Sequence, residues 1–389
     1  MIFDPYADPT PLGGISASLQ HKMKYIDEFF NDKLCQELVQ KIIETSDGRT
    51  MTFMEVCGTH TMAIFRYGIK SLLPPNIKLL SGPGCPVCVT PNSDIDKMIA
   101  YACQDNVIIA TFGDMMRVPG STSSLSQEKA LGRDIKIVYS VNDALKIAET
   151  NLDKSVIFIG VGFETTAPSV AVSIRDAKIK GLSNYFVFCA HKIIPPAMKV
   201  ILDSGELKLD GFILPGHVST IIGTMAYEFI SQDYHIPCVV AGFEATDILQ
   251  AILMLTNQVV RGGISCIENQ YKRSVKAEGN PKALAILNEV FEPIDSEWRG
   301  IGIIPNSGLK IRQEYKEFDA EQVIPVGITL NSQLLTLNSQ CICGDILRGI
   351  KIPTDCKLFG NACIPETPVG PCMVSSEGTC SAYYKYQDL

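Results

Sequence analysis

The chain has 389 residues, of which 46% are hydrophobic and 20% are charged, as is usual for globular proteins. This length predicts roughly two or three domains. The formal net charge of −8 at pH 7 excludes a general attraction to nucleic acid or to an anionic membrane surface, so we expect neither as a partner.

The first residues and the apolar stretches argue against export and membrane insertion. Asp4 and Asp8 stand where a secretory signal would carry a basic segment and an apolar run. The apolar stretch 239–255 is interrupted by Glu244 and Asp247, and it falls short of the roughly 18 uncharged residues that a membrane span needs. We therefore expect a cytoplasmic protein. Its 14 cysteines should serve packing, metal ligation or redox chemistry, because cytoplasmic thiols stay reduced.

Short apolar runs alternate with amphipathic stretches along much of the chain. The predicted strands cover residues 77–80, 107–111, 135–139, 156–161, 185–189, 211–214 and 237–241. The predicted helices cover residues 34–45, 94–103, 141–152, 168–179, 221–230 and 246–259. Because parallel strands need a crossover connection, this alternation predicts an α/β fold with parallel sheets covered by helices.

A short internal repeat indicates two such sheets. The segment Gly-Phe-Glu-Thr-Thr at residues 162–166 returns as Gly-Phe-Glu-Ala-Thr at residues 242–246, each time directly after an apolar run. We therefore expect two parallel-sheet α/β lobes that face a cleft, one within residues 1–145 and one within residues 146–260.

The segment 261–389 lacks this periodicity and is rich in turns and cysteines. Its last cysteines are Cys341, Cys343, Cys356, Cys363, Cys372 and Cys380. Four thiolates can bind zinc or a [4Fe–4S] cluster. Zinc usually takes two close cysteine pairs, whereas only Cys341 and Cys343 are close in sequence here, which favours iron–sulfur. We expect a loop-rich third domain that the cluster holds together.

Ligands of parallel sheets bind beyond the carboxyl ends of the strands. The loops at these positions carry Asp114, Glu164, His191 and His217, and we expect these side chains to line the cleft. Each histidine could orient a ligand or be structural. Asp114 and the nearby Arg117 could bind an anion or pair with each other.

Two more cysteine motifs lie nearer the N-terminus. Cys85 and Cys88 form a CxxC motif after a strand, which can be a redox dithiol or half of a metal site. Cys57 is followed by Gly-Thr59-His60. A thiol beside a histidine can be a nucleophile with its base, a metal ligand, or a packing cysteine. The residue types leave these alternatives open.

In this order the motifs resemble the HypD family of hydrogenase maturation proteins. The matching segments are 54–61, 82–91, 111–115, 162–168 and 371–378. The resemblance implies a scaffold that assembles the Fe(CN)2CO group of [NiFe] hydrogenase on ferrous iron. It implies a stable complex with HypC, cyanide delivery by HypE with HypF upstream, and transfer to the hydrogenase large subunit.

The resemblance also implies a role for each motif. Cys57 would hold the iron together with a HypC cysteine, and Thr59 and His60 would orient around it. Cys85 and Cys88 would be a redox dithiol near the iron and are further candidate metal ligands. The expected ligands of the [4Fe–4S] cluster are Cys343, Cys356, Cys363 and Cys380. The expected thiol pair beside the cluster is Cys341 and Cys372.

Two other function classes stay open. The chain could be a cluster-dependent thiol-disulfide oxidoreductase, although Cys57 in its Gly-Thr-His context has no use in such an enzyme. It could also be a zinc-stabilised binding module without redox function. The sequence has neither G-x-x-x-x-G-K-[ST] nor G-x-G-x-x-G between a strand and a helix, so we expect partners to supply any ATP-linked chemistry.

Overall fold

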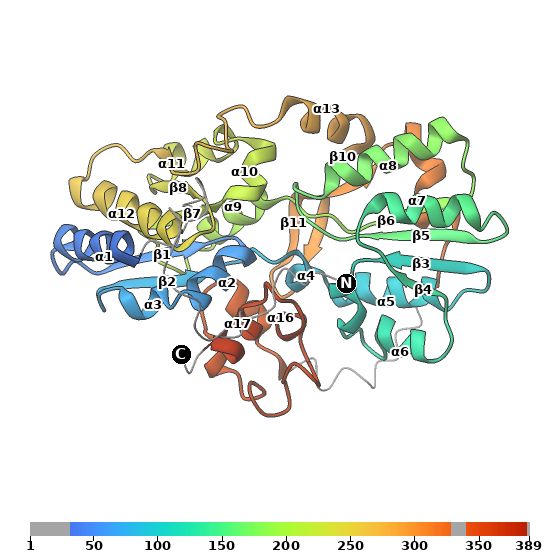
Figure 1. Ribbon diagram of the computed structural model, residues 1–389, viewed down its shortest axis with the longest axis horizontal. Helices are drawn as coiled ribbons and strands as arrows, with labels where there is room; N and C mark the ends of the chain where they lie inside the picture. The colour runs from blue at the N-terminus through green and yellow to red at the C-terminus, as the bar shows by residue number, and fades with distance from the viewer. Residues whose placement is uncertain (1–31, 328–339, 387–389) are drawn as a thin grey trace, which may run out of the picture.

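The computed structural model describes residues 32–327 and 340–386. Two parallel β-sheets lie toward opposite ends of the long axis, and the C-terminal segment lies between and below them in the view of Figure 1. The prediction of an α/β fold with parallel sheets is therefore confirmed. In the described ranges, no helix is both long enough and apolar enough to cross a bilayer.

The first sheet has the strand order β2-β1-β7-β8-β9, and all neighbouring strands are parallel. Its strands are β1 (Met51–Glu55), β2 (Ile77–Ser81), β7 (Gly211–Pro215), β8 (Cys238–Ala241) and β9 (Ile267–Asn269). The helices α1 (Asp32–Ser46) and α12 (Ala245–Arg261) pack against each other on one face. Their apolar side chains share a core with Phe53, Ile213 and Val239 of the strands.

The second sheet has the parallel order β4-β3-β5-β6. Its strands are β3 (Val107–Thr111), β4 (Ile135–Ile137), β5 (Ser155–Gly160) and β6 (Tyr185–Cys189). The helices α7 (Val141–Thr150) and α8 (Ala167–Lys180) cover one face, and α5 (Asn92–Ala102) covers the other. Because both faces are covered, β3 and β5 read as continuous apolar runs.

The two sheets interleave along the chain. The second sheet joins β3 and β4 to β5 and β6, which lie on opposite sides of the expected boundary at residue 145. The first sheet joins β1 and β2 to β7, β8 and β9, and β9 lies beyond residue 261. The sheets therefore do not follow the expected ranges 1–145, 146–260 and 261–389. Periodicity identifies a strand but not its neighbours, which explains the difference.

Most predicted elements are present, with small differences at their ends. The predicted helix 221–230 is wrong: α10 (Gly216–Ile222) ends at Gly223, and the next α-helix, α11, covers Glu228–Asp233. Gly223 has a φ of 79°, a left-handed backbone that glycine adopts readily and that ends a helix.

A hairpin and short helices complete the described chain. The antiparallel strands β10 (Phe291–Trp298) and β11 (Gly302–Ile311) form the hairpin, which was not predicted. The C-terminal helices are α15 (Cys343–Leu347), α16 (Pro371–Val374) and α17 (Thr379–Tyr386). Helix α17 packs on α2 (Gly58–Arg66), and α16 packs on α4 (Pro86–Val89). The C-terminal cysteines thus lie beside both N-terminal cysteine motifs.

Candidate functional site

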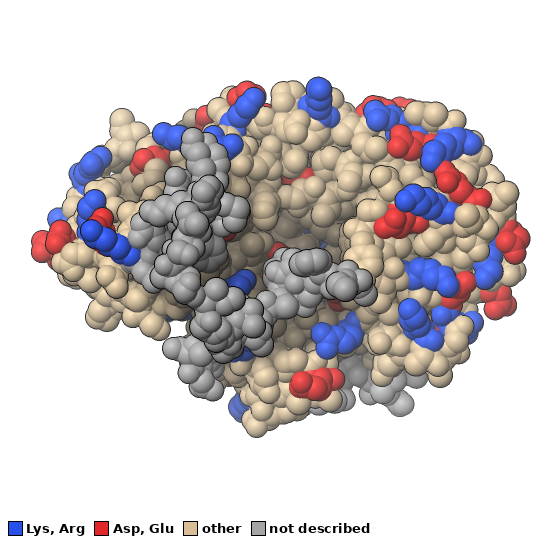
Figure 2. All heavy atoms as spheres, in the orientation of Figure 1, with Lys and Arg blue, Asp and Glu red and all other residues tan. Residues whose placement is uncertain are grey.

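A cavity of about 650 Å³ lies at the carboxyl ends of the strands. Loops after β1, β2, β3, β5 and β7 contribute to its wall, together with one residue of the C-terminal segment. Figure 2 shows the surface hollowed near the middle of the molecule, between the two sheets. The position agrees with the general rule for ligand sites in parallel sheets.

Cys57 lines this cavity at the start of α2 and is 7% exposed. Its backbone N–H donates to Oε2 of the buried Glu55 at 2.9 Å, and the Thr61 hydroxyl donates to Oε1 of the same carboxyl group at 2.5 Å. Glu55 therefore fixes the first turn of α2. Burial raises the pKa of Glu55 to about 7, so this carboxyl group is about half protonated near neutral pH.

The Cys57 thiol is held in its protonated form. Burial raises its pKa to about 12, and the nearby charge of Glu377 adds to the rise. Backbone N–H groups of His60 and Thr59 oppose it. The thiol is therefore neutral at pH 7.

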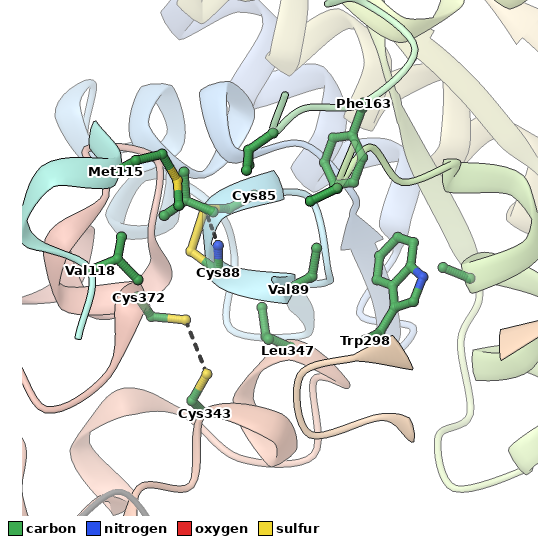
Figure 3. Close-up of a cluster of buried hydrophobic side chains, with 14 of the residues drawn as sticks. Cys85, Cys88, Val89, Met115, Val118, Phe163, Trp298, Cys343, Leu347 and Cys372 are labelled. Atoms are coloured by element: carbon green, nitrogen blue, oxygen red, sulfur yellow. Dashed lines mark hydrogen bonds between the residues drawn. A yellow bond between two sulfur atoms is a disulfide. The ribbon is translucent and has the colours of Figure 1, made fainter. Parts of the chain in front are cut away.

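The Cys85–Cys88 pair lies directly beside Cys57. Gly58 N–H donates to the Gly84 carbonyl at 2.9 Å, and a Cβ at Gly84 would overlap the backbone nitrogen of Cys57. Only glycine allows this approach. Cys85 and Cys88 form a disulfide, and the Cys85 sulfur also accepts from the Cys88 N–H at 3.2 Å (Figure 3).

Three neighbouring rings extend the site from α2 into the first sheet. His60 Nε2 contacts the Gly242 carbonyl at 2.9 Å, so this nitrogen carries the hydrogen. Its ring lies 4.8 Å from Phe243, which stacks on His217 at 3.9 Å between centroids. Burial lowers the pKa of His60 to about 4, so the ring is neutral at pH 7. His217 reaches the cavity, whereas His60 supports it from behind.

Glu377 closes the cavity from the C-terminal segment. Thr59 donates its hydroxyl hydrogen to Glu377 Oε1 at 2.7 Å. Burial raises the pKa of Glu377, and the charge of Asp114, which also lines the cavity, adds to the rise. The sequence motif 371–378 contains Glu377, but a single Glu in Ser-Ser-Glu-Gly gives no chemical signal, so sequence reasoning gave it no role.

Two residues expected in the cleft do not line it. Glu164 turns away and accepts the Ile194 N–H at 3.0 Å, at the start of α9 (Ile194–Ser204), where a carboxyl group is favoured. His191 is buried behind β6, with Nδ1 3.5 Å from the Cys189 sulfur. Both positions follow strand ends as expected, but the loop backbone directs the side chains inward.

The C-terminal cysteines surround a second, small cavity. Its lining cysteines are Cys341, Cys356, Cys363, Cys372 and Cys380. The sixth, Cys343, has its sulfur 3.5 Å from the Cys372 sulfur (Figure 3). In the structure the Cys343 sulfur is the one that lies against Cys372, and the expected pair of Cys341 with Cys372 stays a prediction. Cys341 and Cys343 are separated by one residue and also contact each other, so spacing alone does not distinguish their roles.

The donor set around this cavity is of the kind that a [4Fe–4S] cluster requires. Its wall offers enough thiols for four ligands, and apolar side chains such as Ile346 and Met373 exclude water. Among the residues placed in the structure, no three His, Cys, Asp or Glu side chains converge on one point, as a single ion requires.

Comparisons with known proteins identify the family. The HypD model, described as hydrogenase formation hypA family, matches residues 33–387. Hydrogenase maturation factor HypD2 of Bradyrhizobium diazoefficiens is 48% identical over 373 residues, covering 94% of this chain and 97% of the relative. HypD of Rhizobium leguminosarum is also 48% identical, covering 94% and 96%. HypD of Cupriavidus necator is 48% identical as well, covering 94% and 97%. The chain therefore belongs to the HypD family of hydrogenase maturation factors.

Proposed function

We propose that this maturation factor is the scaffold on which ferrous iron receives its cyanide and carbonyl ligands before transfer to the hydrogenase large subunit. Its partners are HypC, which supplies a second cysteine to the iron, and HypE, which delivers cyanide made with HypF. The observation that carries the proposal is the position of Cys57, at the wall of a cavity and directly beside the Cys85–Cys88 pair.

The cavity suits iron as the substrate. A soft thiolate stabilises ferrous iron that carries strong-field ligands, and a single protein ligand leaves coordination positions open. Asp114 and Glu377 line the cavity, and none of the described lining residues is Lys or Arg. Such a wall attracts a divalent cation and repels free cyanide anion. Cyanide is therefore expected to arrive in neutral form, bound to its carrier.

The CxxC pair can supply the electrons that cyanide release needs. A thiocyanate on the carrier, R–SCN, takes up two electrons and one proton and yields R–SH and cyanide. Oxidation of the Cys85 and Cys88 thiols to a disulfide provides two electrons and two protons, which leaves one proton over. Such a step would leave Cys85 and Cys88 as a disulfide, the form in which they stand in the structure.

The C-terminal cysteines would complete the redox chain. The proposed cluster ligands are Cys341, Cys356, Cys363 and Cys380. The Cys343–Cys372 pair shares one buried core with Cys85 and Cys88, and Figure 3 shows it below their disulfide. When bound, the cluster supplies single electrons.

The oxidoreductase alternative has less support. Cys85 and Cys88 are 4% and 0% exposed, so a protein disulfide has no access to either sulfur. Pro86 and Val87 line the cavity, so a small carrier group inside it comes much closer to the Cys85–Cys88 pair than a protein disulfide can. The burial of the pair favours a small substrate group.

Infrared spectroscopy of the anaerobic complex with HypC tests the proposal. Bands in the cyanide and carbonyl stretching regions are expected in the wild type and in the Cys266→Ala control, whose thiol is exposed and remote from the motifs. They should be absent in Cys57→Ala, while the cluster absorption remains. Retention of the bands in Cys57→Ala would refute the iron site, and stoichiometric zinc without iron would support the binding-module alternative.

A further inference from the structure

Arg299 connects the CxxC helix to the C-terminal cysteines. Its backbone N–H donates to the Val89 carbonyl at 2.8 Å, and its Nε donates to the Thr90 carbonyl at 2.8 Å. Val89 is the last residue of α4, the helix that begins directly after Cys85. The guanidinium group is therefore anchored to the end of the element that carries the disulfide.

The next residue contacts the C-terminal segment. A Cβ at Gly300 would overlap the Cα of Gly344, so the two glycine backbones touch. Gly344 directly follows Cys343. Arg299 thus lies between two elements that each carry a sulfur pair.

The charge of Arg299 reaches several C-terminal sulfurs. This charge acts on Cys341, Cys343 and Cys372, so the guanidinium group lies near these three sulfurs. These effects agree with the backbone contacts in placing the cation beside the cysteine group.

One nitrogen of Arg299 lacks an acceptor in the described part of the chain. Its Nη2 atom is buried and has no hydrogen-bond partner there, whereas Nε is satisfied by Thr90. A buried guanidinium N–H without an acceptor is costly, so an acceptor is expected at this point. Thiolate and cluster sulfide sulfurs accept such hydrogen bonds, and the groups that lie near Arg299 are the C-terminal cysteines.

We propose that Arg299 donates a charged hydrogen bond to the sulfur centre formed by the C-terminal cysteines and holds its reduction potential high. The inference rests on the proposed function, which places a [4Fe–4S] cluster there. Reduction of the cluster from the 2+ to the 1+ state adds one electron and no proton, so the added negative charge is stabilised by the adjacent cation. Arg299 acts through this charge and touches no substrate.

Redox titration followed by electron paramagnetic resonance tests the role of Arg299. In Arg299→Gln, the equilibrium constant for one-electron reduction should fall about tenfold, which lowers the midpoint potential by about 59 mV. Arg299→Lys keeps the charge and should lie closer to the wild type. The matched control is Arg348→Gln, because Arg348 directly follows the helix that begins at Cys343 but is paired with Glu206 and Asp345. An unchanged potential in Arg299→Gln at full iron content would overturn the proposal.

Two further measurements cover other outcomes. If Arg299→Gln does not fold, wild-type protein labelled with ¹⁵N-arginine should show a nitrogen coupling to the reduced cluster that is lost in Arg299→Lys; no coupling in the wild type contradicts the hydrogen bond. If the wild type binds no cluster, the proposed [4Fe–4S] cofactor is wrong, but the inference about Arg299 can still be tested. The midpoint of the Cys343–Cys372 couple, measured by alkylation in thiol buffers, should then still fall in Arg299→Gln, and an equal midpoint overturns the inference.

Discussion

The network behind His60 makes a quantitative prediction for Asp247→Ala. Asp247 is 1% exposed, and its Oδ1 accepts from Arg273 Nη1 at 2.9 Å and from Gln270 Nε2 at 2.7 Å. Its Oδ2 accepts a second hydrogen bond from Arg273. Gln270 in turn accepts the Gly242 N–H at 3.0 Å, and the Gly242 carbonyl contacts His60. The mutation therefore breaks a buried ion pair and loosens the loop that positions His60.

The expected cost follows from the burial of each partner. Breaking a fully buried ion pair costs about 3–5 kcal/mol. The Arg273 side chain is 35% exposed and regains water when its partner is lost, so we expect about 2–3 kcal/mol. Asp247→Asn keeps an oxygen acceptor and should cost less. Asp203→Ala is the control, because Asp203 forms an exposed pair with Lys199 and its loss should change little.

Urea unfolding, followed by circular dichroism and by fluorescence, measures the effect. The chain has a single tryptophan, and Trp298 lies in the hairpin, far along the chain from the mutated network. Coincident transitions by both probes would justify a two-state free energy. A loss below about 0.5 kcal/mol in Asp247→Ala, equal to that of an ordinary surface mutation, would refute the reasoning.

Three further outcomes are expected. Gly84→Ala should destabilise the protein by about 1–3 kcal/mol and abolish iron binding, because the added methyl group overlaps Cys57. Gly113→Ala should do neither, because its methyl group would make only an ordinary contact with Ile137 at 3.8 Å. Burial raises the pKa of Glu164 to about 7, so the folded state keeps a proton that the unfolded state releases above pH 4.5. The free energy of unfolding should therefore fall by about 3 kcal/mol as pH rises from 4.5 to 7. Urea titrations at each pH would measure this fall, which should be smaller in Glu164→Gln. Cys341→Ala should lose cluster iron and sulfide, whereas Cys343→Ala should keep them.

The sequence predicts β3, β5 and β6 of the second sheet well because each is a nearly continuous apolar run. It misses β1, whose residues Met-Thr-Phe-Met-Glu include a buried carboxyl group that has no place in such a pattern. Glu55 is tolerated there because it accepts the Cys57 N–H and the Thr61 hydroxyl. A strand that serves the site is thus harder to recognise than one that serves only the core.

The sequence also predicts the cysteine motifs of the site but not all of their neighbours. Cys57, Cys85 and Cys88 stand out because each stands in a motif that is typical of metal or redox chemistry. Glu377 is separated from Thr59 by more than 300 residues and becomes visible only when α17 packs on α2. The Cys343–Cys372 contact likewise depends on how two short helices are oriented, which spacing does not encode.

The interleaved chain path makes the site a property of the whole chain. Cys57 follows β1, which pairs with β7 through the register Glu55 to Ile213, and His217 follows β7 directly. Asp114 follows β3 of the other sheet. His217 follows a strand of one sheet and Asp114 a strand of the other, and Glu377 belongs to neither sheet. Neither sheet alone therefore forms the cavity wall. A fragment that ends at residue 145 would lack the neighbour β7 that holds β1 in place, so the Cys57 loop should lose its position even though its motif is intact.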